Sequence, residues 1–407
     1  MNNSFRPRGR GGRGRFKGRS AVGRGPRFNR SNGRGNRFSK KTISHDKFIN
    51  KQPTAIVEEN YIPKHTFSDF GFHLHIVDNL KKKGYETPMR VQDEAIPPIL
   101  AGRDVIGLAN TGSGKTAAFV LPIIQKLKTQ KVRENVLIIT PTRELAQQIQ
   151  MEFKEFANGM QLYSTVCVGG LGIRLQIRDL RRGPPVVIGT PGRLKDLIKQ
   201  GELPLNKTTT LVLDEADHML DMGFLPDINF ILGKLPRDRQ SLCFSATITP
   251  DISRLLDKML VDPIKVSVRT SSTGEHIAQD IIKVKKPEDK IEELIKMLKQ
   301  EHFERVLIFG EMKHAVQKLS DTLNKRGFNS IAIHGNKSQP QRQKALEAFK
   351  TGKVNILVAT GVAARGLDIP NVSHVINYDQ PNTHEEYVHR IGRTGRAGKP
   401  GQAYTFV

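Results

Sequence analysis

The chemistry in this chain centres on a glycine-rich stretch, ANTGSGKT, at residues 109–116. It follows an apolar run typical of a strand and precedes one typical of a helix. Backbone N–H groups of such a turn, together with a helix N-terminus, can cradle phosphates. The Lys115 ammonium would reach the β and γ phosphates of a nucleotide, and the Thr116 hydroxyl would bind Mg²⁺. We expect a nucleotide to be held by Thr111, Gly112, Ser113, Gly114, Lys115 and Thr116.

A second stretch, TLVLDEADHML at residues 210–220, supplies acidic side chains. Its apolar run places Asp214 at the end of a strand, where a carboxylate can bind Mg²⁺. Glu215, the next residue, can orient or deprotonate an attacking water. Acidic residues are also common at the solvated start of a helix, which is the alternative interpretation. The glycine-rich turn in the same domain favours catalysis, so we expect nucleotide hydrolysis rather than binding alone.

The elements that position these residues form two series of short, β-rich apolar runs that alternate with helical stretches. The first series comprises DVIGLA, NVLIIT, PVVIGT, TLVLD and SLCFSA, and the second comprises RVLIF, SIAIH, VNILVAT, HVINY and QAYTFV. This alternation predicts parallel sheets with helices on both faces. A polar segment at 269–276 separates the series and is expected to be a linker. The predicted fold is therefore α/β, with tandem domains at 61–268 and 277–407 after a lead-in at 1–60.

Charge is concentrated at the N-terminus. The chain of 407 residues has a net charge of +25, and residues 1–41 carry 11 arginines, 3 lysines and no acidic residue. With 9 glycines and few aliphatic residues, this segment cannot bury enough apolar surface to fold, so we expect disorder. Its phenylalanines are Phe5, Phe16, Phe28 and Phe38. Arginines and spaced rings suit single-stranded nucleic acid, although a solubilising tail is the alternative.

Composition also indicates the compartment. The chain has 2 cysteines, Cys167 and Cys243, both in apolar runs, which excludes a disulfide framework and favours a reducing environment. Its longest apolar runs are far shorter than a membrane span of roughly 18 residues, and no signal peptide precedes them. We expect a soluble, cytoplasmic protein that does not contact membranes.

Eight motifs occur in an order that resembles one family: ANTGSGKT, PTREL, GG, TPGR, DEAD, SAT, ARGLD and HRIGRTGR. The sequence resembles the DEAD-box ATP-dependent RNA helicases over residues 61–407. This resemblance implies two RecA-like domains that face each other, with ATP and Mg²⁺ between them and single-stranded RNA lying across both. We also expect a monomer. Family members commonly continue with a further helix after the last expected strand, so a truncated C-terminus and a natural end are both open interpretations of this sequence.

The resemblance assigns two residues to adenine. Gln92 is expected at the adenine edge, where an amide both donates and accepts hydrogen bonds, and Phe67 is expected to stack on the ring. Met89 and Arg90 stand where the family commonly has threonine and proline. The alternative is that Phe67 is a core residue and Gln92 a surface helix residue.

HRIGRTGR, at residues 389–396, is either a basic surface patch or half of an active site. The resemblance places Arg393 and Arg396 against the γ-phosphate as arginine fingers, which requires the two domains to close. Paired glycines between the arginines favour this over a patch. By the same resemblance, Asp368 binds a ribose hydroxyl, while His389 and Arg390 link the motif to its neighbours.

RNA contacts are expected from loops of both domains. By resemblance, glycine backbones, helix N-termini and arginines would bind sugar and phosphate, so sequence preference would be weak and salt dependence strong. Gly361 departs from the aspartate that is frequent before VAARGLD. The assigned residues are Thr142, Arg143, Gly169, Gly170, Thr190, Gly192, Arg193, Gln339, Arg342, Thr360 and Gly361.

Coupling between hydrolysis and RNA is assigned to Ser245 and Thr247, which by resemblance bond Asp217. If each ligand binds both domains, ATP and RNA would favour closure together, and a closed surface that fits only a bent strand would open short duplexes. We expect nonprocessive unwinding or remodelling of RNA and RNA–protein complexes. An ATP-dependent RNA clamp or annealing chaperone, and a DNA-directed helicase, are the alternatives.

Overall fold

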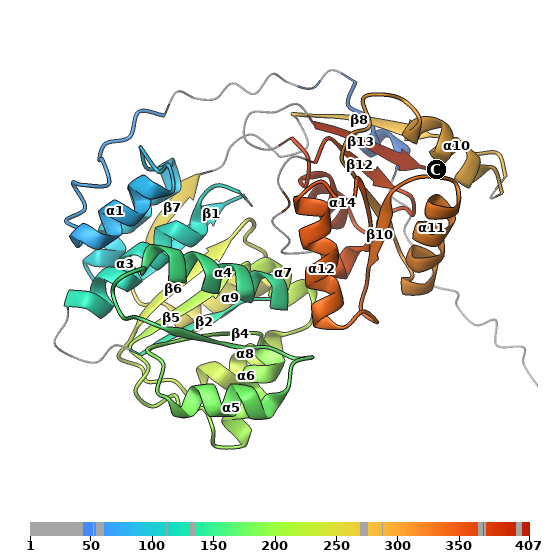
Figure 1. Cartoon of the computed structure of the whole chain (residues 1–407). Helices are drawn as coiled ribbons and strands as arrows, with labels where there is room; N and C mark the ends of the chain where they lie inside the picture. The colour runs from blue at the N-terminus through green and yellow to red at the C-terminus, as the bar shows by residue number, and fades with distance from the viewer. Residues whose placement is uncertain are drawn as a thin grey trace, which may run out of the picture. The chain divides into compact units, whose positions relative to one another are not determined.

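The computed structural model describes residues 44–51, 53, 61–110, 112–129, 135–268, 276–286, 288–364, 369, 372–395 and 401–407 (Figure 1). Four expectations lie outside these residues: the basic segment 1–41, and the roles of Thr111, Asp368 and Arg396. Of the expected linker 269–276, only His276 is described.

The first sheet has seven strands in the order β3-β4-β2-β5-β6-β1-β7, and every pairing in it is parallel. Its strands are β1 (Val105–Ala109), β2 (Val136–Ile139), β3 (Ser164–Cys167), β4 (Val186–Gly189), β5 (Thr210–Asp214), β6 (Gln240–Ser245) and β7 (Ile264–Val268). The predicted parallel α/β architecture is thereby confirmed for this domain.

Both faces of this sheet are buried, which explains its continuous apolar runs. In β2, Leu137 and Ile139 enter one hydrophobic cluster, while Val136 and Ile138 enter the other. Successive strand side chains alternate between faces, so a sheet covered on both sides needs apolar residues at every position.

Helices cover the two faces separately (Figure 1). One face packs against α1 (Leu74–Lys82), α2 (Arg90–Leu100), α3 (Lys115–Thr129) and α4 (Arg143–Phe156). The other packs against α5 (Ile173–Arg181), α6 (Pro191–Lys199), α7 (Ala216–Asp221), α8 (Leu225–Leu232) and α9 (Pro250–Met259).

The second sheet has six parallel strands in the order β10-β11-β9-β12-β13-β8. Its strands are β8 (Ile277–Ile282), β9 (Val306–Gly310), β10 (Ser330–Ile333), β11 (Ile356–Thr360), β12 (His374–Asn377) and β13 (Gly401–Phe406). Its helices are α10 (Asp289–Leu298), α11 (Lys313–Lys325), α12 (Gln339–Lys350), α13 (Gly361–Ala364) and α14 (His384–Ile391). Two hydrophobic clusters again lie on opposite faces.

A short segment of the expected lead-in packs against the second sheet. The 3₁₀ helix η1 (His45–Phe48) buries the Phe48 ring completely, edge to face with Tyr387 at 4.7 Å between ring centroids. Asn50 forms a two-way backbone bridge with Gln279, with N···O distances of 2.8 and 2.9 Å. Residues 45–50 therefore extend the core of the second domain.

Both cysteines are buried and carry free thiols. Burial raises the pKa of the Cys167 thiol to about 12, so this thiol stays protonated at neutral pH. Within the described part of the chain, none of the helices combines the length and apolarity needed to cross a bilayer.

Candidate functional site

The order of strands in the first sheet divides the expected site residues into two groups. Parallel strands place their carboxyl ends at one edge, where ligands of open α/β sheets bind. The neighbours β5, β6 and β1 end at the acidic stretch, at Ser245 and at the glycine-rich turn. The neighbours β3, β4 and β2 end at the GG, TPGR and PTREL motifs. The phosphate-loop and acidic residues expected to bind the nucleotide, and the first-domain residues expected to bind RNA, thus follow adjacent strands at one edge of the sheet.

The glycine-rich turn has the backbone that a phosphate loop needs. Gly112 and Gly114 have φ angles of 84° and 88°, in the left-handed region that favours glycine. Helix α3 begins at Lys115, whose side chain is buried and donates from Nζ to the carbonyl of Ala109 at 2.8 Å. The ammonium is therefore held over the turn, beside the N–H groups of a helix N-terminus that attracts anions.

Asp214 ends β5 and is buried. Burial raises the pKa of its carboxyl to about 7; Lys115 opposes this shift and Glu215 adds to it. A divalent cation at this carboxylate would stabilise its ionised form, and Thr116 could add a hydroxyl oxygen. Among the described residues no group of three or more His, Cys, Asp or Glu side chains could hold a metal ion. The pair formed by the Asp214 carboxylate and the Thr116 hydroxyl still fits Mg²⁺, which is usually bound by one or two carboxylates together with substrate phosphates.

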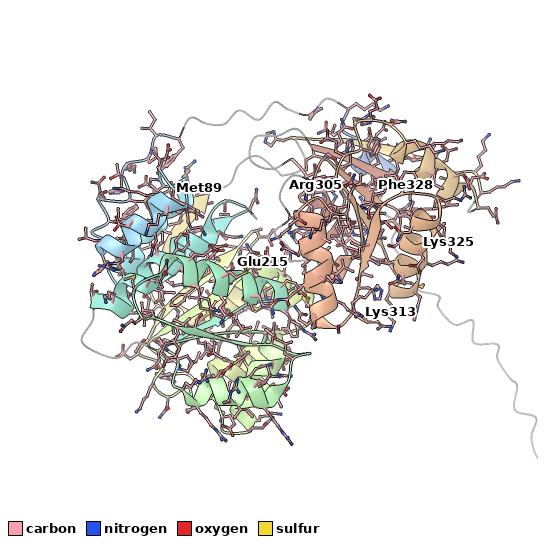
Figure 2. All side chains as sticks on the ribbon, viewed as in Figure 1. Met89, Glu215, Arg305, Lys313, Lys325 and Phe328 are labelled. Atoms are coloured by element: carbon pink, nitrogen blue, oxygen red, sulfur yellow. The ribbon has the colours of Figure 1, made fainter. Side chains whose placement is uncertain are left out.

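Glu215, labelled in Figure 2, follows β5 in the left-handed backbone region, with a φ of 53°. Its Oε2 lies 2.9 Å from Nδ1 of His218, and both side chains are buried. Burial raises the pKa of this carboxyl, but His218, Lys115 and Arg393 together lower it to about 2. The carboxylate is therefore ionised at neutral pH and can accept a hydrogen bond from water.

Two side chains of the second domain, His389 of α14 and Arg393 just after it, lie near Glu215 and His218. His218 Nε2 lies 3.2 Å from Nδ1 of His389, and the two rings meet edge to face at 4.3 Å. Arg393 is buried and contributes to the lowered pKa of Glu215. The structure thus brings His389 and Arg393 of HRIGRTGR to the acidic stretch. His218 was not among the residues assigned from the sequence, because its position in DEADHML carries no signal of a partner far along the chain.

Asp217 organises the loop after β6. Its Oδ2 accepts hydrogen bonds from the backbone N–H of Ala246 and of Thr247, each at 3.0 Å, and from the Thr247 hydroxyl at 3.3 Å. Its own N–H donates to Ser245 Oγ at 3.3 Å, and that hydroxyl donates to the carbonyl of Thr247 at 2.8 Å. The acidic stretch and the SAT motif are thereby joined into one hydrogen-bonded unit.

The two residues assigned to adenine are both buried. Gln92 donates from Nε2 to the carbonyl of Gly114 at 3.2 Å and accepts from the N–H of Met89 at 2.9 Å. Phe67 packs against Phe70 and Tyr85, each with its ring centroid at 6.2 Å. Gln92 therefore contacts the glycine-rich turn, and adenine binding by either residue stays a prediction.

Asp93, next to Gln92, was missed by the sequence reasoning. It is buried on α2 and accepts hydrogen bonds from the Tyr61 hydroxyl, the Lys64 N–H and the His65 ring. Burial raises the pKa of this carboxyl, but these hydrogen bonds outweigh burial and lower it. Asp93 thus fastens the segment that leads to Phe67 onto α2.

The RNA-assigned residues of the first sheet lie at loops and helix N-termini. Thr142 caps α4 by accepting from the N–H of Leu145 at 3.2 Å, and Thr190 precedes the first residue of α6. The Arg143 guanidinium lies against Gly170, where an added Cβ would stand 1.9 Å from Nη1. A side chain at position 170 would have an unfavourable φ of 76° and would displace the Arg143 guanidinium, so glycine lets Arg143 lie close to the backbone.

The other RNA-assigned residues of the first domain are Gly169, Gly192 and Arg193. Gly169 also borders the Arg143 guanidinium, with a Cβ-to-Nη2 distance of 3.4 Å for an added Cβ. Gly192 lies in the first turn of α6, and Arg193 donates to the carbonyl of Leu171 at 3.2 Å.

Two RNA-assigned residues of α12, in the second domain, contact Glu144 of PTREL, one through a hydrogen bond and one through an ion pair. Gln339, the first residue of α12, donates from Nε2 to Glu144 Oε1 at 3.1 Å, and Arg342 Nε lies 2.9 Å from the same oxygen. Glu144 is a further residue that the sequence reasoning missed. Thr360 ends β11 and Gly361 begins α13.

Comparison with known proteins gives two matching family models. The model of the DEAD/DEAH box helicase matches residues 89–255, and that of the helicase conserved C-terminal domain matches residues 289–398. ATP-dependent RNA helicase dbp2 of Neurospora crassa is 42% identical, over 89% of this chain and 66% of its own length. ATP-dependent RNA helicase CshA of Limosilactobacillus reuteri is 43% identical, over 84% of this chain and 69% of its own. The chain spans about two thirds of the length of these relatives.

Solved structures share the fold. Mss116p bound to single-stranded RNA and AMP-PNP aligns with a TM-score of 0.77 and 28% identity, over 88% of this chain and 77% of that chain. S. cerevisiae Dbp5 bound to RNA and ADP BeF3 aligns with a TM-score of 0.74 and 29% identity, over 84% of this chain and 89% of that chain. The prediction of tandem RecA-like domains is confirmed.

Proposed function

Because the chain belongs to the DEAD-box family of ATP-dependent RNA helicases, we propose that its RNA-dependent ATPase drives local, nonprocessive opening of short RNA duplexes. The same cycle would remodel RNA–protein complexes. The observation that carries the proposal is the chain of contacts from Glu215 through His218 to His389, which joins the catalytic edge of one sheet to HRIGRTGR beside the other.

In this mechanism the glycine-rich turn and Lys115 bind the nucleotide phosphates. Mg²⁺, held by Thr116 and Asp214 when bound, would neutralise charge on the phosphates. Glu215 accepts a hydrogen bond from the attacking water and orients it toward the γ-phosphate. Its low pKa keeps Glu215 ionised, so its carboxylate orients the attacking water by accepting a hydrogen bond from it. Arg393 offsets negative charge that develops during transfer.

RNA would bind across the PTREL, GG and TPGR loops of the first domain and the N-terminus of α12 in the second. Arg342 forms an ion pair with Glu144, so an RNA phosphate would compete with this carboxylate for the guanidinium. Contacts of this kind go to the sugar–phosphate backbone. They support binding with weak sequence preference and strong salt dependence.

Coupling follows from shared surfaces. If ATP and RNA each bind residues of both domains, each raises the affinity for the other by the same factor. Closure would also complete the site around Glu215, so RNA would stimulate hydrolysis. A closed surface that accepts only a bent single strand would separate a few base pairs, and release of phosphate would end the cycle before long duplexes open.

The proposal is tested by measuring ATPase rates without nucleic acid, with single-stranded RNA and with single-stranded DNA. Strand separation is then measured on RNA duplexes of roughly one and roughly four helical turns. We expect stimulation by RNA alone and single-event opening of the short duplex only. Equal stimulation by DNA would favour the DNA-directed alternative, and efficient single-event opening of the long duplex would refute nonprocessive action.

An RNA clamp or annealing chaperone is the second candidate, and the basic segment 1–41 favours it. Under this alternative, RNA-stimulated hydrolysis would occur without opening of the short duplex. Deleting residues 1–41 tests the segment itself: unchanged RNA affinity and an unchanged salt slope would exclude it as a binding element.

A monomeric state and a cytoplasmic location also remain proposals. Light scattering after gel filtration would show the first through a mass near 45.6 kDa, and microscopy of a tagged chain would show the second. Dimerisation, or accumulation in another compartment, would contradict them.

A further inference from the structure

Gly361 begins α13, and the structure shows what fills the space beside it. An added Cβ on Gly361 would lie 2.8 Å from Glu386 Oε1 and 3.7 Å from Arg390 Nη2. Glu386 and Arg390 both belong to α14, the helix that leads into HRIGRTGR. A carboxylate is therefore present beside this loop, but it comes from a different element.

The contacts of Glu386 are specific. Its Oε1 accepts from Arg390 Nη2 at 2.7 Å, and its Oε2 accepts from the N–H of Asn382 at 3.0 Å. Arg390 has only 4% of its side chain exposed, and Nη1 donates to the carbonyl of Asp379 at 2.8 Å. A buried guanidinium requires a counter-charge, and Glu386 forms the ion pair with it.

The neighbouring acidic side chain has other partners. The carboxylate of Asp379 lies 3.3 Å from Lys290 Nζ and accepts from the N–H of Glu311 at 2.9 Å. It contacts Arg390 through its main-chain carbonyl. Glu386 is thus the better placed source of negative charge for the guanidinium.

A small cavity of about 10 Å³ borders Gly361, Glu386, Arg390 and Arg393. The loop after β11, the ion pair and the expected arginine finger therefore form one contiguous group. A movement of the loop after β11 would shift Glu386 and, through the ion pair, Arg390. Arg393 lies three residues further along the chain.

We propose that Glu386 is a positioning residue whose carboxylate, supplied from α14, fills the space beside Gly361 and holds Arg390. It links the expected RNA-binding residues Thr360 and Gly361 to HRIGRTGR. This inference rests on the proposed function, because it concerns how RNA binding is passed to hydrolysis.

The test moves the carboxylate between the two positions. Gly361→Asp alone places two carboxylates in one space, and Glu386→Ala alone leaves Arg390 without its counter-charge. Each is expected to lower the RNA-stimulated kcat about tenfold or more. The double variant Gly361→Asp/Glu386→Ala is expected to return within about threefold of the unaltered protein, because aspartate then fills the vacated space.

Two controls separate charge from space. The double variant Gly361→Ala/Glu386→Ala has room but no carboxylate, so it should stay as impaired as Glu386→Ala. Glu385→Ala removes a neighbouring exposed charge from the same helical turn and should leave kcat within about twofold. Melting temperatures are measured on every variant, so that loss of folding is seen directly.

Rescue by the Asp/Ala pair but not by the Ala/Ala pair would support the proposal. Additive losses in the Asp/Ala pair would overturn it, and so would rescue by the Ala/Ala pair. Absence of RNA stimulation in the unaltered protein would instead refute the proposed function, so the two failures are distinguishable.

Discussion

Replacing His218 probes the hydrogen bond that holds the expected catalytic carboxylate. In His218→Ala, Glu215 Oε2 loses a partner at 2.9 Å while remaining buried. The pKa of Glu215 is about 2 against an ordinary value of 4.5, and His218 is the first of the groups that lower it. That difference corresponds to about 3 kcal/mol in favour of the ionised form.

A hydrogen bond to a charged group contributes about 1.5 to 3 kcal/mol, so losing the one between His218 and the buried Glu215 carboxylate should cost about 2 kcal/mol. Applied to the transition state, about 2 kcal/mol lowers kcat about thirtyfold. The KM for ATP should stay within about threefold, because the phosphates are held by the glycine-rich turn instead. His218→Asn places an amide donor near the position of Nδ1 and should lose only about fivefold.

The assay is steady-state ATP hydrolysis at saturating RNA, with His314→Ala as a control at an exposed histidine of α11. Unchanged kcat in His218→Ala would refute the reasoning. A raised KM at constant kcat would do so too, because it would place His218 in nucleotide binding. Equal losses in the Asn and Ala variants would show that the hydrogen bond to Glu215 is not what matters.

Three further predictions concern other parts of the structure. Gly170→Ala places a Cβ 1.9 Å from Arg143 Nη1, at a position whose φ is 76°. It should weaken RNA binding about tenfold and reduce the salt slope by about one, measured by fluorescence anisotropy. Unchanged affinity would contradict this prediction. Asp217→Ala leaves three donors of the SAT loop without their acceptor and should lower stability by about 2 to 3 kcal/mol, measured by thermal melts. It should also separate ATP hydrolysis from duplex opening, which a strand-separation assay would check. Burial lowers the pKa of His374 from 6.5 to about 4, so the unfolded chain binds more protons than the folded chain between these pH values. Stability should therefore fall by about 2 kcal/mol as the pH drops from 6.5 toward 4. His374→Phe should flatten that dependence in thermal melts across the pH range, and an unchanged slope would refute the prediction.

Much of the fold could be predicted because the apolar pattern of a segment agrees with its buried position in the sheet. VLII and TLVLD are continuous apolar runs, and they form β2 and β5 in the middle of a sheet covered on both faces. Two strands at sheet edges, β7 and β8, were not predicted. In β7 only Val266 is buried, and such a half-exposed run resembles a loop.

The site was predictable where one short motif carries all its members, as in the turn from Gly112 to Thr116. Contacts between distant segments could not be predicted. Glu144 and Gln339 are 195 residues apart, and no local pattern encodes that meeting. Phe48 was placed in a lead-in for the same reason, since its partner Tyr387 lies at the other end of the chain.

The most direct test of the account is the ATPase rate of the unaltered protein and of Arg393→Ala, each with and without single-stranded RNA. Arg254→Ala, at an exposed arginine of α9, serves as the control. Closure of the two domains on one nucleotide predicts strong RNA stimulation that the Arg393 variant loses by about a thousandfold and the control retains. RNA-independent turnover, or stimulation that survives in Arg393→Ala, would contradict a site completed by both domains.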